Sequence, residues 1–129
     1  MKFGLSTDTS GATSVHKIAN ELDSIFPALA SQFPSVEIEI FFVFRCVPDG
    51  IGRKSSRRFS KAESVLYLDM CLSEDLLKDM DVAQQRSLVA SHFFDYVEAS
   101  LNKYEFKGLD VASFMAALKR EAASIGWRD

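Results

Sequence analysis

Carboxylates are groups that could carry out chemistry, and they outnumber the cations in this sequence, with 18 Asp and Glu residues against 15 Lys and Arg. Paired carboxylates can bind a divalent cation or act as general acid and base. Several of them, however, occupy positions that begin helices. Ser73 precedes Glu74 and Asp75, and Asp81 precedes Gln84 by three residues, as in a capping box. Helix stability explains these acidic residues, and we expect neither a metal nor a cofactor.

Asp69 differs from the other acidic residues because it lies inside an apolar run, between Leu68 and Met70. A carboxylate there either lies on an exposed sheet face or has a partner, and Glu37 and Glu39 share that face if the register allows. An acidic surface on an open sheet face suits a basic protein partner. The acidic residues predicted to contact a partner are Glu37, Glu39, Asp69, Glu74, Asp75 and Asp79.

A basic cluster lies between two apolar runs, and it places five cations within nine residues around Phe59. Its members are Arg53, Lys54, Arg57, Arg58 and Lys61. Such a cluster can bind phosphates while the aromatic ring stacks on a base. It can also be a solvated hairpin tip whose charges discourage edge pairing, or an arm that contacts a protein. The first option gives an alternative function, a small nucleic-acid-binding accessory protein that uses residues 53–61.

Histidines and cysteines form no recognised catalytic arrangement in this sequence. Asp95 follows His92 by three residues and could hydrogen-bond to it across one helical turn, but no nucleophile lies at a known spacing. Cys46 and Cys71 lie in apolar runs without a Cys-x-x-Cys pattern, and we expect reduced core thiols that come close if the two strands pair as a hairpin. We therefore predict no enzyme; a nonstandard site near His92, within a deep pocket, is a third alternative.

Periodic apolar residues predict the elements of the first half of the chain. Residues 15–33 form one helical stripe, in which Pro27 predicts a kink or a break. Ser35–Cys46 alternates at first and then becomes apolar on both faces, which predicts a central strand in a covered sheet. Val65–Leu72 is the second strand, and Val47–Ser60 is a long connection between the two.

Helices are predicted for the second half of the chain. They cover Glu74–Met80, the segment from Asp81 to about Tyr104, and Val111–Ile125. Gly126 occupies the position of a left-handed C-cap, and we expect Trp127 to fold back onto the core.

The predicted fold is a single α+β domain over residues 1–129. An antiparallel sheet, which includes Ser35–Cys46 and Glu63–Leu72, carries three main helices in the order (β)αββααα, with a possible edge strand at residues 2–6. The length suits one domain, and the formal net charge of −3 argues against a general nucleic-acid binder. We expect a cytoplasmic protein without a membrane partner, because neither a signal-peptide core nor an apolar run of about 18 residues is present.

The strands SVEIEIFFVFRC and ESVLYLDMCLS precede a helix-rich half that contains SHFFDYVEASLNKY. In size, charge and layout, the whole chain resembles the bacterial immunity proteins that neutralise polymorphic or contact-dependent-inhibition toxins. The resemblance implies tight binding to a cognate toxin, blocking its active site or access to its substrate, and many such toxins are basic nucleases. No diagnostic motif transfers functional residues. The basic residues Arg53, Arg57 and Arg58 depart from the acidic pattern, and they either contact acidic parts of a toxin or form a tip.

Overall fold

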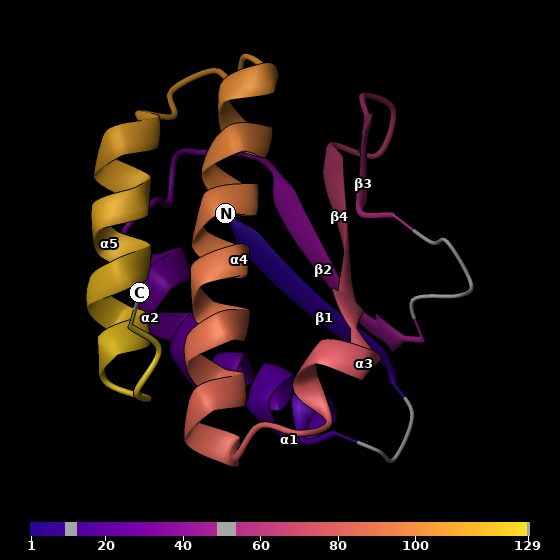
Figure 1. Ribbon diagram of the computed structural model, residues 1–129. Coiled ribbons are helices and arrows are strands. Elements are labelled where there is room, and N and C mark those ends of the chain that lie inside the picture. Colours follow the sequence, from indigo (N-terminus) through magenta and orange to yellow (C-terminus); the bar gives the residue numbers. More distant parts are fainter. Residues whose placement is uncertain (10–12, 49–53, 129) are drawn as a thin grey trace.

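The computed structural model describes residues 1–9, 13–48 and 54–128, and it consists of a twisted sheet with helices packed against one face (Figure 1). The sheet has four strands in the order β1-β2-β4-β3. Strands β1 (Lys2–Thr9), β2 (Glu39–Val47) and β4 (Val65–Ser73) run parallel to one another. The edge strand β3 (Ser56–Ser60) runs antiparallel to β4, so the sheet is mixed.

The predicted antiparallel sheet is therefore wrong, although the predicted α+β class is confirmed. The two apolar strands β2 and β4 lie side by side but parallel. The hairpin is instead formed by β3 and β4, which the turn at residues 61–64 joins. Part of the segment that was predicted as a long connection forms this edge strand, β3. After β2 the chain passes to the side of β4 that faces away from β2, forms β3 there, and then turns back into β4. Parallel neighbours require such a crossover.

Strand β2 alternates along its whole length, so the prediction of two apolar, covered faces is also wrong. Ile40, Phe42 and Phe44 are buried beneath the helices, whereas Phe41 and Val43 are half-buried on the opposite face. That opposite face carries no helix in the described part of the chain (Figure 1). Residues Ser35 to Ile38 precede the strand rather than beginning it.

The predicted first helix is divided into α1 (Val15–Asn20), the 3₁₀ helix η1 (Glu21–Ile25) and α2 (Phe26–Ser31). The break precedes Pro27, which occupies the first turn of α2. A proline is tolerated there because its missing N–H would have no intrahelical partner. The apolar stripe stays on one side, and Ile18, Leu22, Ile25 and Leu29 are all buried.

The second-half helices are α3 (Glu74–Leu77), α4 (Val82–Lys103) and α5 (Val111–Ala123). Their predicted starts are confirmed, because each N-cap side chain accepts a backbone hydrogen bond. The pairs are Leu76 N with Ser73 Oγ at 3.1 Å, Gln84 N with Asp81 Oδ1 at 2.8 Å, and Ser113 N with Asp110 Oδ1 at 3.1 Å. Local sequence therefore determines where these helices begin.

Trp127 folds back onto the core, as predicted, and is 1% exposed. Its ring centroid lies 5.4 Å from that of Phe93 and 6.2 Å from that of Phe44. Gly126 has a φ of +83°, which is the left-handed conformation expected at a helix C-cap. The indole Nε1 donates to Glu21 Oε1 at 2.9 Å, so the buried N–H has a partner.

The two cysteines point to opposite faces of the sheet. Cys46 is buried beneath the helices, and burial raises the pKa of its thiol. Cys71 is half-buried on the other face, where its strand neighbour on β2 is Arg45. The hairpin that was to bring the thiols close is not formed, because β2 and β4 run parallel, and the alternation of side chains along a strand places the two cysteines on opposite faces.

Candidate functional site

We call the side of the sheet without a described helix the open face. Alternate residues of all four strands form it, because side chains in a strand alternate between faces. Its members are Gly4, Ser6 and Asp8 of β1, Phe41, Val43 and Arg45 of β2, Tyr67, Asp69 and Cys71 of β4, and Ser56 and Arg58 of β3. The open face therefore combines charged, aromatic and small residues from segments that lie far apart in the sequence.

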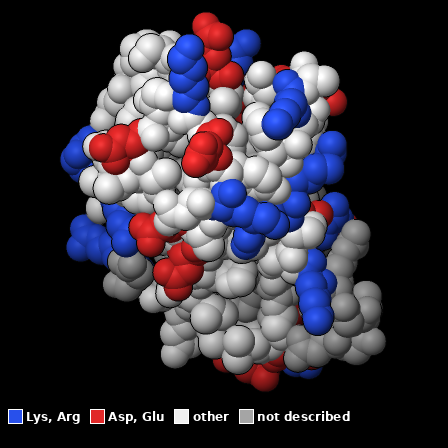
Figure 2. Space-filling model, turned by 90° about the horizontal axis from the view of Figure 1, so that it is seen from above, with Lys and Arg blue, Asp and Glu red and all other residues white. Residues whose placement is uncertain are grey.

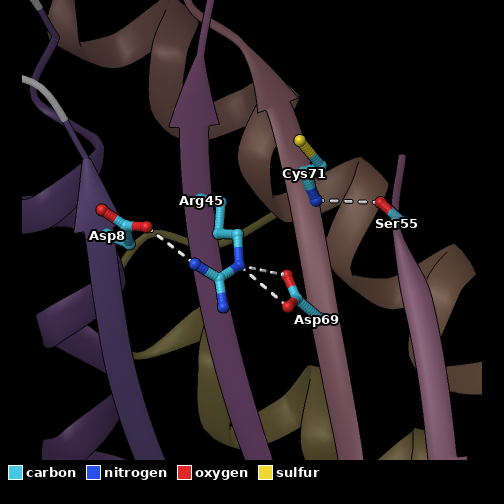
Figure 3. A network of polar contacts seen from close by, with 5 residues as sticks. All are labelled: Asp8, Arg45, Ser55, Asp69 and Cys71. Carbon is cyan, nitrogen blue, oxygen red and sulfur yellow. Dashed lines mark hydrogen bonds and ion pairs between the residues drawn. The ribbon is translucent and has the colours of Figure 1, made fainter. Parts of the chain in front are cut away.

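Arg45 lies at the centre of a charged row that crosses three strands (Figure 3). Its Nη1 donates to Asp8 Oδ2 at 2.7 Å, and its Nε donates to both carboxylate oxygens of Asp69 at 2.8 Å. These hydrogen bonds, first of all the one to Asp69, raise the pKa of the Arg45 guanidinium. Asp69 thus meets both expectations for a carboxylate in this strand, since it lies on an open face and has a partner.

An aromatic row runs across the same face. The Phe41 ring covers Gly4, where an added Cβ would lie 2.5 Å from Phe41 Cδ2. On the other side, Phe41 contacts Tyr67 with ring centroids 6.1 Å apart, and Arg58 Cζ lies 4.4 Å from the Tyr67 ring centroid. The Tyr67 hydroxyl donates to Glu63 Oε2 at 2.8 Å, and this bond raises the pKa of Tyr67. The rings are therefore held in place by neighbours on both sides.

A groove of about 470 Å³ lies between the charged row and the aromatic row. It is lined by Val43, Arg45, Ser56, Arg57, Arg58, Tyr67 and Asp69. Guanidinium groups, an aromatic ring and an aliphatic side chain thus meet around one concave surface, a composition typical of protein-binding hot spots.

The basic cluster is separated by the sheet. Arg58 projects to the open face, whereas the Arg57 guanidinium lies 4.8 Å from the Tyr96 ring centroid of α4, on the helical side. Arg53 lies outside the described residues. The guanidinium groups of Arg57 and Arg58 therefore lie on opposite sides of the sheet, although both residues line the groove, and no observation on the described residues favours the nucleic-acid alternative.

The predicted acidic residues fall into three separate places rather than one patch. Asp69 of β4 is the strand neighbour of Val43, which follows Glu39 by four residues on β2. Glu39 therefore lies on the same face as Asp69 but about 13 Å from it, at the usual rise of a strand. Glu37 and Glu39 border a depression of about 500 Å³, which Glu63 and Lys2 also line. At this end of the molecule, acidic and basic side chains are interspersed (Figure 2).

The remaining predicted acidic residues lie at the other end of the sheet. Glu74 and Asp75 belong to α3, and Asp79 follows it in the turn before α4. Asp75 is paired with Lys78 at 3.5 Å. Among the residues that the structure describes, no cluster of His, Cys, Asp and Glu could hold a metal ion.

His92 lies on α4 with its ring stacked on Tyr96 at a centroid distance of 6.2 Å. Burial lowers the pKa of His92, and the nearby Asp95 charge opposes this shift. His92 Nε2 has no hydrogen-bond partner among the described residues. None of the cavities of about 500, 590 and 470 Å³ is lined by His92, so the geometry gives the third alternative no support.

Comparison with models of protein families matches residues 1–123 to Immunity protein 44. The chain belongs to the Immunity protein 44 family. The resemblance to bacterial immunity proteins is thereby confirmed. No curated protein and no solved structure matches this sequence.

The match to Immunity protein 44 includes all four strands and all of α5, so the open face lies entirely within the family region. No described helix is long and apolar enough to cross a membrane. Arg45 and Tyr67 were missed as site residues by sequence reasoning. The sequence indicates these two residues only weakly. A lone Arg or Tyr in an apolar strand can be recognised as a site residue only once the strand order places it beside Asp69 or Arg58.

Proposed function

We propose that this immunity protein binds a cognate toxin through the open face and occludes the toxin's active site. The observation that carries the proposal is a sheet face that no described helix covers and on which Arg45 and the aromatic row are held by neighbours. Binding proteins commonly concentrate affinity in a few Arg and aromatic side chains. Groups that are ordered before binding lose less conformational entropy when the complex forms.

The charge of the chain supports a basic toxin, such as a nuclease domain. The formal net charge is −3, and Asp8 on the open face is well exposed, with 64% of its side chain accessible. Opposite net charges accelerate association, while buried contacts slow dissociation. In this proposal the protein acts in the cytoplasm as a stoichiometric inhibitor and catalyses no reaction itself.

Protection of cells tests the proposal. The probe is the toxin domain encoded beside the gene, produced together with the protein. Ser6 and Ser56 are exposed on the open face, and Ser87 is exposed on α4. We expect Ser6→Arg and Ser56→Arg to abolish protection, because each adds a bulky side chain where the toxin docks, whereas Ser87→Arg should protect fully. Loss of protection with Ser87→Arg alone would contradict the proposed surface.

A further inference from the structure

We propose that the groove on the open face binds a carboxylate side chain of the toxin, with Arg58 as its principal partner. This inference rests on the proposed function and identifies the chemistry of one contact within it. The groove is bordered by Arg45, Arg58, Tyr67 and Asp69. Arg45 and Asp69 are already paired with each other.

Arg57 and Arg58 both line the groove, but only Arg58 has its guanidinium on the open face. It is exposed, and its guanidinium stacks on Tyr67 at 4.4 Å. Among the described ion pairs, none involves Arg58. Stacking fixes the plane of a guanidinium, and although Arg58 also hydrogen-bonds to Tyr67, its five N–H groups leave further donors available in that plane. An arriving carboxylate can therefore accept two hydrogen bonds from Arg58 in the usual bidentate geometry.

Arg45 and Asp69 form the opposite wall, and the Arg45 guanidinium also pairs with Asp8, so one cation serves two carboxylates. Both Asp69 oxygens accept from Arg45 Nε, so this carboxylate has a cationic partner before anything enters the groove. Arg45 Nη2 makes no hydrogen bond to a described residue, and in Figure 3 no dashed line reaches it. The wall thus offers one further donor to an anion, beside two carboxylates that already accept from Arg45.

The size and walls of the groove favour an amino-acid side chain. A volume of about 470 Å³ accommodates a Glu or Asp side chain, and Val43 and Tyr67 provide apolar contact for its methylene groups. Covering the groove on docking would exclude water, and a charged hydrogen bond is stronger in such surroundings. A nucleic acid would bring many phosphates close to Asp8 and Asp69, which a chain of net charge −3 disfavours.

Calorimetry with the purified toxin domain tests this inference. Arg58→Gln should raise Kd by about 10- to 100-fold, because it removes a charged contact at the centre of the interface. Arg58→Lys should restore affinity only in part, because a lysine cannot form the bidentate contact. Lys61→Gln is the matched control: it removes the same charge at an exposed position of the adjoining turn, and Kd should stay within about 2-fold.

The possible results separate the groove from the proposed function. An unchanged Kd for Arg58→Gln, together with lost binding for Ser6→Arg, would overturn the proposed carboxylate site in the groove. The proposed function of the open face would still stand. No binding by the unchanged protein would overturn both. A single-stranded oligonucleotide is added as a second probe at ~50 mM salt; binding that Arg58→Gln abolishes would overturn the carboxylate in favour of a phosphate.

Discussion

At the scale of single residues, Glu21 joins three parts of the chain that lie far apart in sequence. Arg86 of α4 donates to it through Nε at 2.9 Å and through Nη2 at 2.7 Å, and Trp127 donates to Oε1 at 2.9 Å. The hydrogen bond from Arg86 contributes most to lowering the pKa of Glu21, while partial burial opposes it. Glu21 therefore holds η1, α4 and the Trp127 indole together.

Replacing Glu21 with Gln should lower the free energy of unfolding by about 1–3 kcal/mol at neutral pH, because Arg86 loses a charged partner. Because the folded pKa of Glu21 is lowered, its contribution is present above the unfolded value and is lost as pH falls below about 4.5. Urea unfolding at several pH values measures both effects. Asp23→Asn, an exposed change in the same 3₁₀ helix, is the control. A deficit for Glu21→Gln that persists at pH ~2 would contradict this role.

His92 predicts a second pH effect in a different range. Its folded pKa is lowered by burial, so the unfolded chain binds more protons just below pH ~6.5. Stability should therefore fall as pH drops from ~7.5 to ~5.5, and His92→Gln should reduce this slope. His16 is exposed on α1, and His16→Gln serves as the control. Equal slopes for the protein and its His92→Gln variant would show that His92 does not titrate in this way.

At the scale of elements, helix starts could be predicted from sequence but strand pairing could not. The caps at Ser73, Asp81 and Asp110 depend on residues within one turn, so a short window contains the whole signal. Whether β2 and β4 run parallel depends on where the chain travels between them. The apolar runs do not indicate that path, because β3 is short and consists mainly of Arg and Ser rather than apolar residues.

The capping box at Asp81 gives a prediction for α4. Its side chain accepts from Gln84 N at 2.8 Å, and Gln84 Oε1 accepts from Asp81 N at 3.0 Å. Asp81→Ala should lower stability by about 1 kcal/mol, because two backbone donors lose or weaken their bonds. Asp79→Ala removes the same charge two residues earlier and should cost less than about 0.5 kcal/mol in thermal and urea unfolding. Equal losses would show that charge rather than capping is responsible.

Gly4 gives a prediction for the packing of β1 against β2. A Cβ at this position would lie 2.5 Å from Phe41 Cδ2, so Gly4→Ala must displace the ring. We expect urea unfolding to show that the free energy of unfolding falls by about 1–3 kcal/mol. The displaced Phe41 ring should also pack less closely against Tyr67. Ser6→Ala, on the same strand and face but exposed, should have little effect. An equally stable Gly4→Ala variant would show that the aromatic row is not fixed by Gly4.

At the scale of the whole molecule, the candidate site arises from topology. The sequence indicated that Asp69 lies on an open face or has a partner, and both are found. It did not reveal Arg45 as that partner, because the register of β2 against β4 places them together. The single acidic patch that sequence reasoning expected is divided among the two ends and the centre of the sheet. The sequence shows which residue types are present, but the residues that lie beside them in space can be identified only from the fold.

In our proposal, the net charge of the molecule affects how fast it associates with the toxin, and the open face determines which toxin it binds. Exposed charges act over a distance that salt shortens, so raising salt from ~0.05 to ~0.3 M should slow association with a basic toxin. Dissociation depends on the covered side chains and should change much less. Surface plasmon resonance with the toxin domain separates the two rates. An association rate independent of salt would contradict the electrostatic part of the account.

The most direct test asks which face the toxin covers. Cysteines introduced one at a time at Ser6, Ser56 and Ser87 report the accessibility of the open face and of α4. Each variant is labelled with a thiol reagent, with and without the toxin domain, and modification is quantified at each site by mass spectrometry. We expect the toxin to protect Ser6→Cys and Ser56→Cys and to leave Ser87→Cys reactive. Protection of Ser87→Cys, with both open-face sites still reactive, would contradict it.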